Sequence, residues 1–150
     1  MNGTFAAHLE QVRTHRGELG EAMAALDAAL ALPVGLGPLW RQRVLAALTE
    51  LAHDLRVHVD LTEAPEGLYA DLRARAPRLA AGVDAQLADH VFLVEEVTGL
   101  LDERDDGVQG DAVAAHRERL NKVLHRLARH RQRGSDLIYE AYSVDIGGSG

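Results

Sequence analysis

Apolar residues recur at intervals of three and four along most of the chain, which is the pattern of amphipathic α-helices. Short segments rich in glycine, proline or aspartate interrupt this pattern, and no segment alternates with a period of two. The pattern therefore predicts an all-α chain with four long helices. These helices are expected over residues 5–32, 39–62, 77–101 and 113–141, and a short apolar run over 68–72 can extend the second of them.

Four helices joined by short connections favour an up-down-up-down antiparallel four-helix bundle. The chain has 150 residues, of which 47% are hydrophobic, so it is long enough to bury one substantial core. We expect a single domain over residues 1–145, followed by a flexible Gly-rich tail over residues 146–150.

Each predicted helix carries one histidine on its apolar stripe. These residues are His15, His58, His90 and His130. A buried imidazole needs a hydrogen-bond partner or a metal, because leaving a polar group dry costs a few kcal/mol. Counting inward at about 1.5 Å per residue places all four histidines within a slab of roughly 6 Å, provided that the second helix continues past Pro65 towards Leu72. We therefore predict that the four converge, and the alternative is that each bonds separately to a backbone carbonyl or a neighbour in the core.

The other histidines serve as internal controls. His116 also lies on the apolar stripe of the fourth helix, but about 21 Å along the axis from His130, so it cannot join the same site. His53 and His125 fall off the stripes, and we expect them to be solvated.

The chain has no cysteine, so a metal would be bound by imidazole and carboxylate groups. Glu63 follows His58 by five residues, a spacing that turns it about 140° away, but Pro65 can kink the preceding turn and swing it inward. Asp136 follows His130 by six, with a glycine between them where the helix can deform. Solvent exposure is the alternative for both carboxylates. The predicted metal ligands are His15, His58, Glu63, His90, His130 and Asp136.

The net charge of −7 argues against a nucleic-acid partner or an anionic membrane surface. No apolar run approaches the roughly 18 residues that span a bilayer, and the first residues lack the pattern of a signal peptide. These features predict a soluble, cytoplasmic protein.

Several short stretches together resemble the hemerythrin-like, or HHE cation-binding, family. They are His15 to Leu19, His58 to Glu63 followed by Gly67 to Tyr69, Asp89 with His90, and His130 followed by Asp136 to Tyr139. The resemblance implies a four-helix bundle with a non-haem diiron centre, whose ligands would include the four stripe histidines. The carboxylate positions are atypical, because Thr62 stands four residues after His58 and Gly134 stands four after His130.

These observations favour a protein that binds non-haem iron, as two ions, as one, or with another divalent metal instead. Such a protein would bind dioxygen or nitric oxide, or buffer iron, and a diiron oxidase is a further alternative. A metal-free helical interaction module with a degenerate site is the alternative from a different class.

Two further groups of residues are of interest. Seven of the 16 basic residues lie between Arg117 and Arg133, and we expect them to form a solvated face that pairs with acidic neighbours. The alternative is a docking surface for an acidic partner or a phosphate-bearing molecule. Tyr69, Tyr139 and Tyr142 are expected at one end of the bundle, with packing or contact to a metal-bound ligand as their two roles.

Overall fold

The computed structural model describes residues 2–103 and 111–147, and within these residues the secondary structure is helical, with no strand. Four long helices account for most of them, and one short helix and two 3₁₀ turns lie in the connections. The elements are α1 (Asn2–Ala31), η1 (Val34–Leu36), α2 (Pro38–Glu63), α3 (Leu68–Arg75), η2 (Pro77–Leu79), α4 (Ala80–Asp102) and α5 (Asp111–Gly147).

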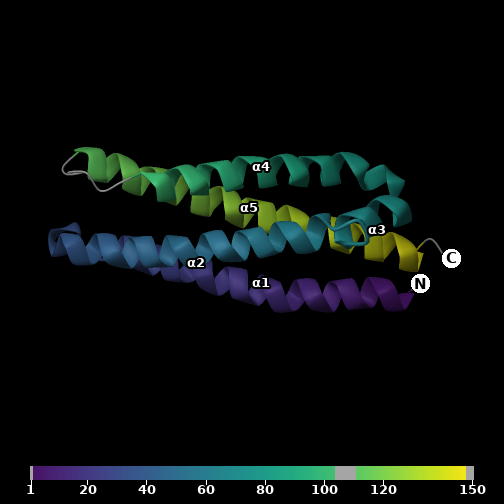
Figure 1. Cartoon of the computed structure of the whole chain (residues 1–150). Helices are drawn as coiled ribbons and strands as arrows, with labels where there is room; N and C mark the ends of the chain where they lie inside the picture. The colour runs from purple at the N-terminus through teal and green to yellow at the C-terminus, as the bar shows by residue number, and fades with distance from the viewer. Residues whose placement is uncertain (1, 104–110, 148–150) are drawn as a thin grey trace.

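The four long helices lie lengthwise beside one another, and the chain reverses direction from each to the next (Figure 1). Helix α1 packs against α2, α2 against α4, and α4 against α5, while α5 also contacts α1. These contacts are compatible with the predicted up-down-up-down bundle. The short helix α3 lies at the end of the molecule where the N-terminus and the C-terminus are found.

The second helix does not continue through Pro65, and that condition of the sequence prediction is wrong. Helix α2 ends at Glu63, and Ala64 adopts an extended conformation with φ −55° and ψ 147°. A proline disfavours helical geometry at the residue before it, which explains the break. The chain then turns at Gly67, whose amide donates to the Ala64 carbonyl at 2.8 Å, and starts the separate helix α3.

The last long helix extends beyond its predicted end. Helix α5 includes residues 146 and 147, which are the first two residues of the predicted Gly-rich tail. Residues 148–150, the rest of that tail, lie outside the described residues.

The apolar core consists of two clusters. The larger one contains Leu19 of α1, Leu55 of α2, Leu93 of α4 and Leu127 of α5 at its inner edge. The smaller one lies at the α3 end and is built around Leu68, Leu72, Val83 and Leu137. On α1, α4 and α5 the stripe histidine falls between residues of the two clusters, and on α2 it follows the last residue of the larger one. The four histidines thus form a polar layer that divides the core.

The turn that joins α2 to α3 requires a glycine at position 67. A Cβ atom there would lie 2.7 Å from the Leu61 carbonyl oxygen and 3.0 Å from that of Ala64. Gly67→Ala is therefore expected to lower the free energy of unfolding by about 1–3 kcal/mol, as overpacking does elsewhere. Gly17→Ala is the matched control, because nothing lies within 4 Å of its Cβ position, and it should raise stability by roughly 0.5–1 kcal/mol. Urea unfolding of both variants tests this, and equal effects would contradict it.

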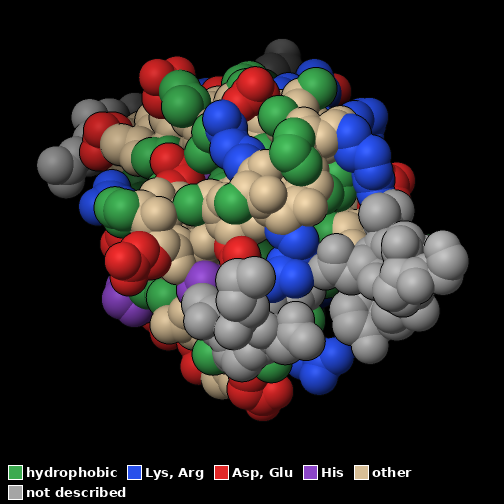
Figure 2. Space-filling model, turned by 90° about the vertical axis from the view of Figure 1, so that its right-hand side faces the viewer, with side chains coloured by type: hydrophobic (Ala, Val, Ile, Leu, Met, Phe, Trp, Pro, Cys, Tyr) green, Lys and Arg blue, Asp and Glu red, His purple; other side chains and the backbone are tan. Residues whose placement is uncertain are grey.

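Several basic residues of α5 pair with acidic neighbours, in agreement with the prediction from the sequence. Arg119 lies 2.6 Å from Glu103 and 3.5 Å from Glu96, and Lys122 lies 3.7 Å from Glu118. Acidic and basic side chains are also interspersed on the end of the molecule that Figure 2 shows. In the described part of the chain, no helix has both the length and the apolar character to cross a bilayer.

Candidate metal centre

Three of the four stripe histidines bring their ring nitrogens together. The Nε2 atom of His130 lies 3.0 Å from Nε2 of His90 and 3.2 Å from Nε2 of His58. One nitrogen of each ring lies within 4.8 Å of those of the other two, which is close enough for the three to share one ion. His90 and His130 are buried and His58 is partly buried.

The convergence arises although the helices end at different levels. His58 lies in the last two turns of α2, whereas α5 continues for several turns beyond His130. The segment from Ala64 to Leu79, which contains α3 and η2, lies at this end of the bundle in place of the predicted continuation of α2. The height of each histidine along the bundle axis therefore depends on how the helices pack. It cannot be obtained by counting residues from the end of the helix.

Two carboxylates fix the orientation of two of the rings. Glu63 Oε2 lies 2.6 Å from His90 Nδ1, and Asp89 Oδ2 lies 3.2 Å from His130 Nδ1. Because an ionised carboxylate only accepts hydrogen bonds, each Nδ1–H must be the donor, and each Nε2 then carries a lone pair. The lone pairs of His90 and His130 face each other at 3.0 Å. Such a contact is repulsive unless a cation lies between them.

Burial keeps these imidazoles neutral. It lowers the pKa of His58 to about 2 and that of His130 to about 4, and neighbouring histidines add to both effects. Burial also lowers the pKa of His90, although Glu63 opposes that shift. A proton is therefore a poor occupant of the gap between the rings, and neutral imidazole is the form that binds metals.

Asp89 is a functional candidate that the sequence prediction missed. Its carboxylate contacts His130 and also accepts a hydrogen bond from Arg126 at 3.0 Å, while Arg133 lies 3.8 Å away. Burial of Asp89 opposes its ionisation, but the hydrogen bonds from His130 and Arg126 outweigh burial and lower the pKa of its carboxyl group. The signal in the sequence was an acidic residue directly before a stripe histidine, which lets it reach the neighbouring helix.

Tyr69 also contacts the cluster. Its side chain is buried and its hydroxyl lies 3.3 Å from His90 Nε2, where it can donate to the lone pair in the metal-free protein. Burial raises the pKa of Tyr69 above its usual range, so the phenol keeps its proton. Of the other two tyrosines, Tyr139 is 72% exposed and makes no part of the site, and the side chain of Tyr142 lies outside the described residues.

His15 is buried beside the cluster without joining it. Its ring stacks on His58 with a centroid separation of 5.9 Å, and neither of its nitrogens has a hydrogen-bond partner among the described residues. Glu18 Oε2 lies 3.7 Å from His15 Nδ1, which is an ion-pair distance but too long for a hydrogen bond.

The structure does not bring Asp136 to the histidines. Asp136 is exposed and accepts a hydrogen bond from Gln132 at 3.0 Å. Helix α5 passes through Gly134 without a break, so the deformation that would have turned Asp136 inward is absent there. Glu63 does reach the cluster, but it contacts Nδ1 of His90 and not the Nε2 atoms that converge.

A small cavity adjoins the cluster. Its volume is about 40 Å³, and its walls include His58, Tyr69, Gln86, His130 and Ser135. The Gln86 Oε1 and Ser135 Oγ atoms are buried and have no hydrogen-bond partner in the described part of the protein. A space of this size with polar walls can hold a water molecule or another small ligand.

Comparisons of the chain with protein-family models, curated proteins and solved structures give no match. Only the residues and their geometry bear on the function of this protein, and the hemerythrin-like resemblance remains a prediction from the sequence.

Removing the charge of Asp89 is expected to weaken a metal bound by the three histidines. Asp89→Asn replaces an acceptor that orients His130, and loss of such an outer partner typically costs about 10–100-fold in metal affinity. Asp136→Asn is the matched control, since this exposed aspartate makes no contact with the cluster, and it should leave affinity unchanged. Competition with a chromophoric chelator measures both, and a larger effect for Asp136 would restore the prediction from the sequence.

Proposed function

We propose that this protein is a metal-binding, hemerythrin-like up-down-up-down antiparallel four-helix bundle, in which the Nε2 atoms of His58, His90 and His130 hold one divalent transition-metal ion. The observation that carries the proposal is the pair of Nε2 lone pairs facing each other at 3.0 Å, each fixed by a carboxylate on the opposite side of its ring. A metal ion between the rings would turn this repulsion into two coordinate bonds.

The distances support this occupant. Zinc and similar ions bind imidazole at about 2.0–2.1 Å, so tetrahedral ligands lie about 3.3 Å from one another. The observed separations of 3.0 and 3.2 Å differ from this by a few tenths of an ångström, within reach of small side-chain shifts. A carboxylate on the second nitrogen of a ligand histidine is the usual outer support in such sites, and His90 and His130 both have one.

The placement of the carboxylates favours one ion over two. A pair of iron ions usually needs carboxylates that bridge the metals and balance their charge. Here Glu63 and Asp89 contact the Nδ1 atoms of histidines and not the Nε2 atoms that converge, and Asp136 is exposed. Neither carboxylate is placed to bridge two ions, and Asp89 already pairs with Arg126, so the cluster suits a single ion better than two. Three imidazoles suit iron, zinc, copper and nickel, and iron is the metal that the hemerythrin-like resemblance suggests.

Three protein ligands leave a tetrahedral ion with one open position. The cavity bounded by His58, Tyr69 and His130 is the nearest space for a fourth ligand, and its volume of about 40 Å³ suits water or a diatomic molecule. We therefore propose reversible binding of a small ligand such as dioxygen or nitric oxide, or storage of the ion itself, as the role of the site.

Titration of chelator-treated protein with Co²⁺ tests the proposal. We expect one equivalent to bind and to develop the visible absorption of tetrahedral Co²⁺, and elemental analysis of protein from iron-supplied cells should find close to one metal ion per chain. Absence of binding would overturn the proposal, and two equivalents with strong coupling would favour the diiron alternative.

A metal-free interaction module is the second candidate, and one observation favours it. The His58–His130 separation of 3.2 Å is also a hydrogen-bond distance, so His58 could donate to His130, and Tyr69 to His90, in a bonded polar layer without a metal. On this alternative, added metal changes neither the absorption nor the melting temperature, and His58→Leu leaves stability unchanged or raised.

A further inference from the structure

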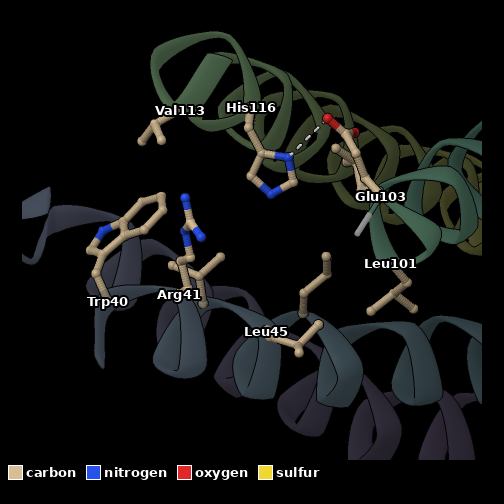
Figure 3. Close-up of a pocket in the computed structure, with 10 residues that line it drawn as sticks. Trp40, Arg41, Leu45, Leu101, Glu103, Val113 and His116 are labelled. Atoms are coloured by element: carbon tan, nitrogen blue, oxygen red, sulfur yellow. Dashed lines mark ion pairs between the residues drawn. The ribbon is translucent and has the colours of Figure 1, made fainter. Parts of the chain in front are cut away.

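Two cavities of the protein differ in the charged side chains around them. The larger one, of about 220 Å³, lies near the opposite end of the bundle from the histidine cluster (Figure 3). Its acidic residue is engaged, since Glu103 lies 3.6 Å from His116 and accepts a hydrogen bond from Arg119 at 2.6 Å. The smaller one, of about 40 Å³, adjoins the cluster and has Arg16 and Arg131 in its wall. No acidic residue lines this smaller cavity within the described part of the chain.

Arg131 is a partly buried cation without an acidic partner. Its terminal nitrogens are held by α1, because Nη2 donates to the Arg16 carbonyl at 3.3 Å and Nη1 lies 3.7 Å from the Met23 sulfur. Its Nε atom is buried without a hydrogen-bond partner, and no ion pair between described residues involves Arg131. Burial and the neighbouring charge of Arg16 lower the pKa of Arg131, although the guanidinium stays charged. Both effects disfavour this cation, and an anion beside it would relieve them.

The position of the Arg131 side chain is fixed by the close approach of α1. A Cβ atom at Gly20 would lie 3.1 Å from Nη2 of Arg131, so the guanidinium lies directly over this glycine. The described side chains of α5 continue to Ala141, and those of α1 begin at Ala6. Each of these limits is 10 residues from Arg131 or Arg16, which is about 15 Å along a helix. The surroundings of Arg131 on α1 and α5 therefore belong to the described part of the protein.

Two further polar atoms in the cavity wall lack partners. Ser135 lies one helical turn after Arg131, on the same face of α5, and its buried Oγ can donate a hydrogen bond to a ligand. Gln86 Nε2 donates to the His130 carbonyl at 3.1 Å, which leaves Gln86 Oε1 as an acceptor. An acceptor repels an anion at contact, so an anion would approach Arg131 and Ser135.

We propose that this cavity binds a small monovalent oxyanion, whose oxygens accept hydrogen bonds from Arg131 Nε and Ser135 Oγ. A guanidinium N–H makes a short and strong hydrogen bond to a negatively charged oxygen. One water molecule needs about 10–15 Å³ of such space, so a volume of about 40 Å³ admits roughly three heavy atoms. Formate and nitrite have this size and charge.

The anion site also bears on the proposed metal. His58 and His130 line the same cavity, so an anion held by Arg131 is close to the open position of an ion bound by the histidines. This part of the inference rests on the proposed function and narrows its small ligand to one with a negative charge. Binding of the anion to Arg131 and Ser135 does not require the metal.

Three probes of nearly the same shape and different charge test the site on chelator-treated, full-length protein. Formate is an anion, formamide is neutral and formamidinium is a cation. In calorimetric titrations at constant ionic strength, we expect saturable binding of formate, at least about tenfold tighter than that of formamide, and no binding of formamidinium. Arg131→Gln should remove this preference, because it removes both the charge and the Nε donor.

Arg129→Gln is the matched control, because it makes the same change of charge at an exposed position of the same helix. It should leave the preference for formate intact. Ser135→Ala removes one donor without a change of charge and should weaken formate binding by about tenfold. Equal affinities for the three probes, or unchanged formate binding in Arg131→Gln, overturn the proposal. If Arg131→Gln does not fold, the three probes on the wild type and the Ser135→Ala variant decide.

A second series separates this inference from the proposed metal site. One equivalent of Zn²⁺ should tighten formate binding further, since the ion adds positive charge beside the cavity. If formate binds to the chelator-treated protein but Zn²⁺ does not, only the proposed function is overturned. If Zn²⁺ binds but neither form of the protein prefers formate over formamide, only the anion site is overturned.

Discussion

Replacing His130 with leucine is expected to lower the affinity of the protein for a divalent metal by more than about 100-fold. His130 is the central member of the cluster, since its Nε2 atom contacts those of both His58 and His90. Loss of an outer partner already costs about 10–100-fold, so loss of a ligand should cost more. Calorimetric titration with Zn²⁺ or Co²⁺ against wild type measures the change.

His125→Leu is the control for this experiment, because His125 is exposed on the same helix. It should bind metal as the wild type does. The metal-free His130→Leu protein is expected to fold as the wild type does, because a leucine at this buried position joins the two apolar clusters and Asp89 keeps its hydrogen bond from Arg126. Unchanged metal affinity in His130→Leu would mean that the three nitrogens do not form the site.

The metal-free protein is expected to lose stability steeply between pH 6.5 and pH 5. Burial lowers the pKa of His58 to about 2 and of His130 to about 4, and it lowers that of His90 as well, whereas the unfolded imidazoles titrate near 6.5. Below pH 6.5 the unfolded chain therefore binds protons that the native state does not. Stability falls with acidification by up to about 1.4 kcal/mol per pH unit for each histidine.

Urea unfolding at intervals across this range measures the slope. His58→Leu should reduce the change of the unfolding free energy with pH by the contribution of one histidine. His53→Leu is the control and should not cause this reduction, because His53 is exposed on the same helix. Saturating metal should hold the protein folded to lower pH, since protons must displace the ion before they bind the rings. A metal-free protein whose stability does not change between pH 6.5 and pH 5 would contradict the proposed burial of neutral histidines.

The retention of a polar layer inside the core is itself informative. The layer interrupts what would otherwise be one continuous apolar core, and buried polar groups do not add net stability over well-packed apolar ones. The Nε2 lone pairs of His90 and His130 also face each other at 3.0 Å, a contact that a bound cation would make favourable. A binding role explains both features.

The periodicity of the sequence predicted the helices and the histidine layer. A position on an apolar stripe is a local property that follows from 3.6 residues per turn, so His15, His58, His90 and His130 could be assigned to the interior with no knowledge of packing. All four are fully or partly buried, and three of them converge. The level of His58 was derived from a continuous helix across Pro65, and that part was wrong because the proline ends the helix.

The carboxylates could not be predicted in the same way. Spacing along one helix was used for Glu63 and Asp136, yet the acidic group that supports a histidine comes from a different helix in both observed pairs. Glu63 of α2 contacts His90 of α4, and Asp89 of α4 contacts His130 of α5. Such contacts depend on the relative rotation and height of two packed helices.

Helical periodicity was thus enough to predict an all-helical chain with a histidine facing the core on each long helix. It could not predict that three of these histidines meet at their Nε2 atoms. It also gave no sign that Glu63 and Asp89 contact the Nδ1 atoms of two of them, or that Tyr69 contacts His90. The physical reason is that helical periodicity fixes which face a side chain occupies, whereas the packing of helices against one another fixes which side chains from different faces come within bonding distance.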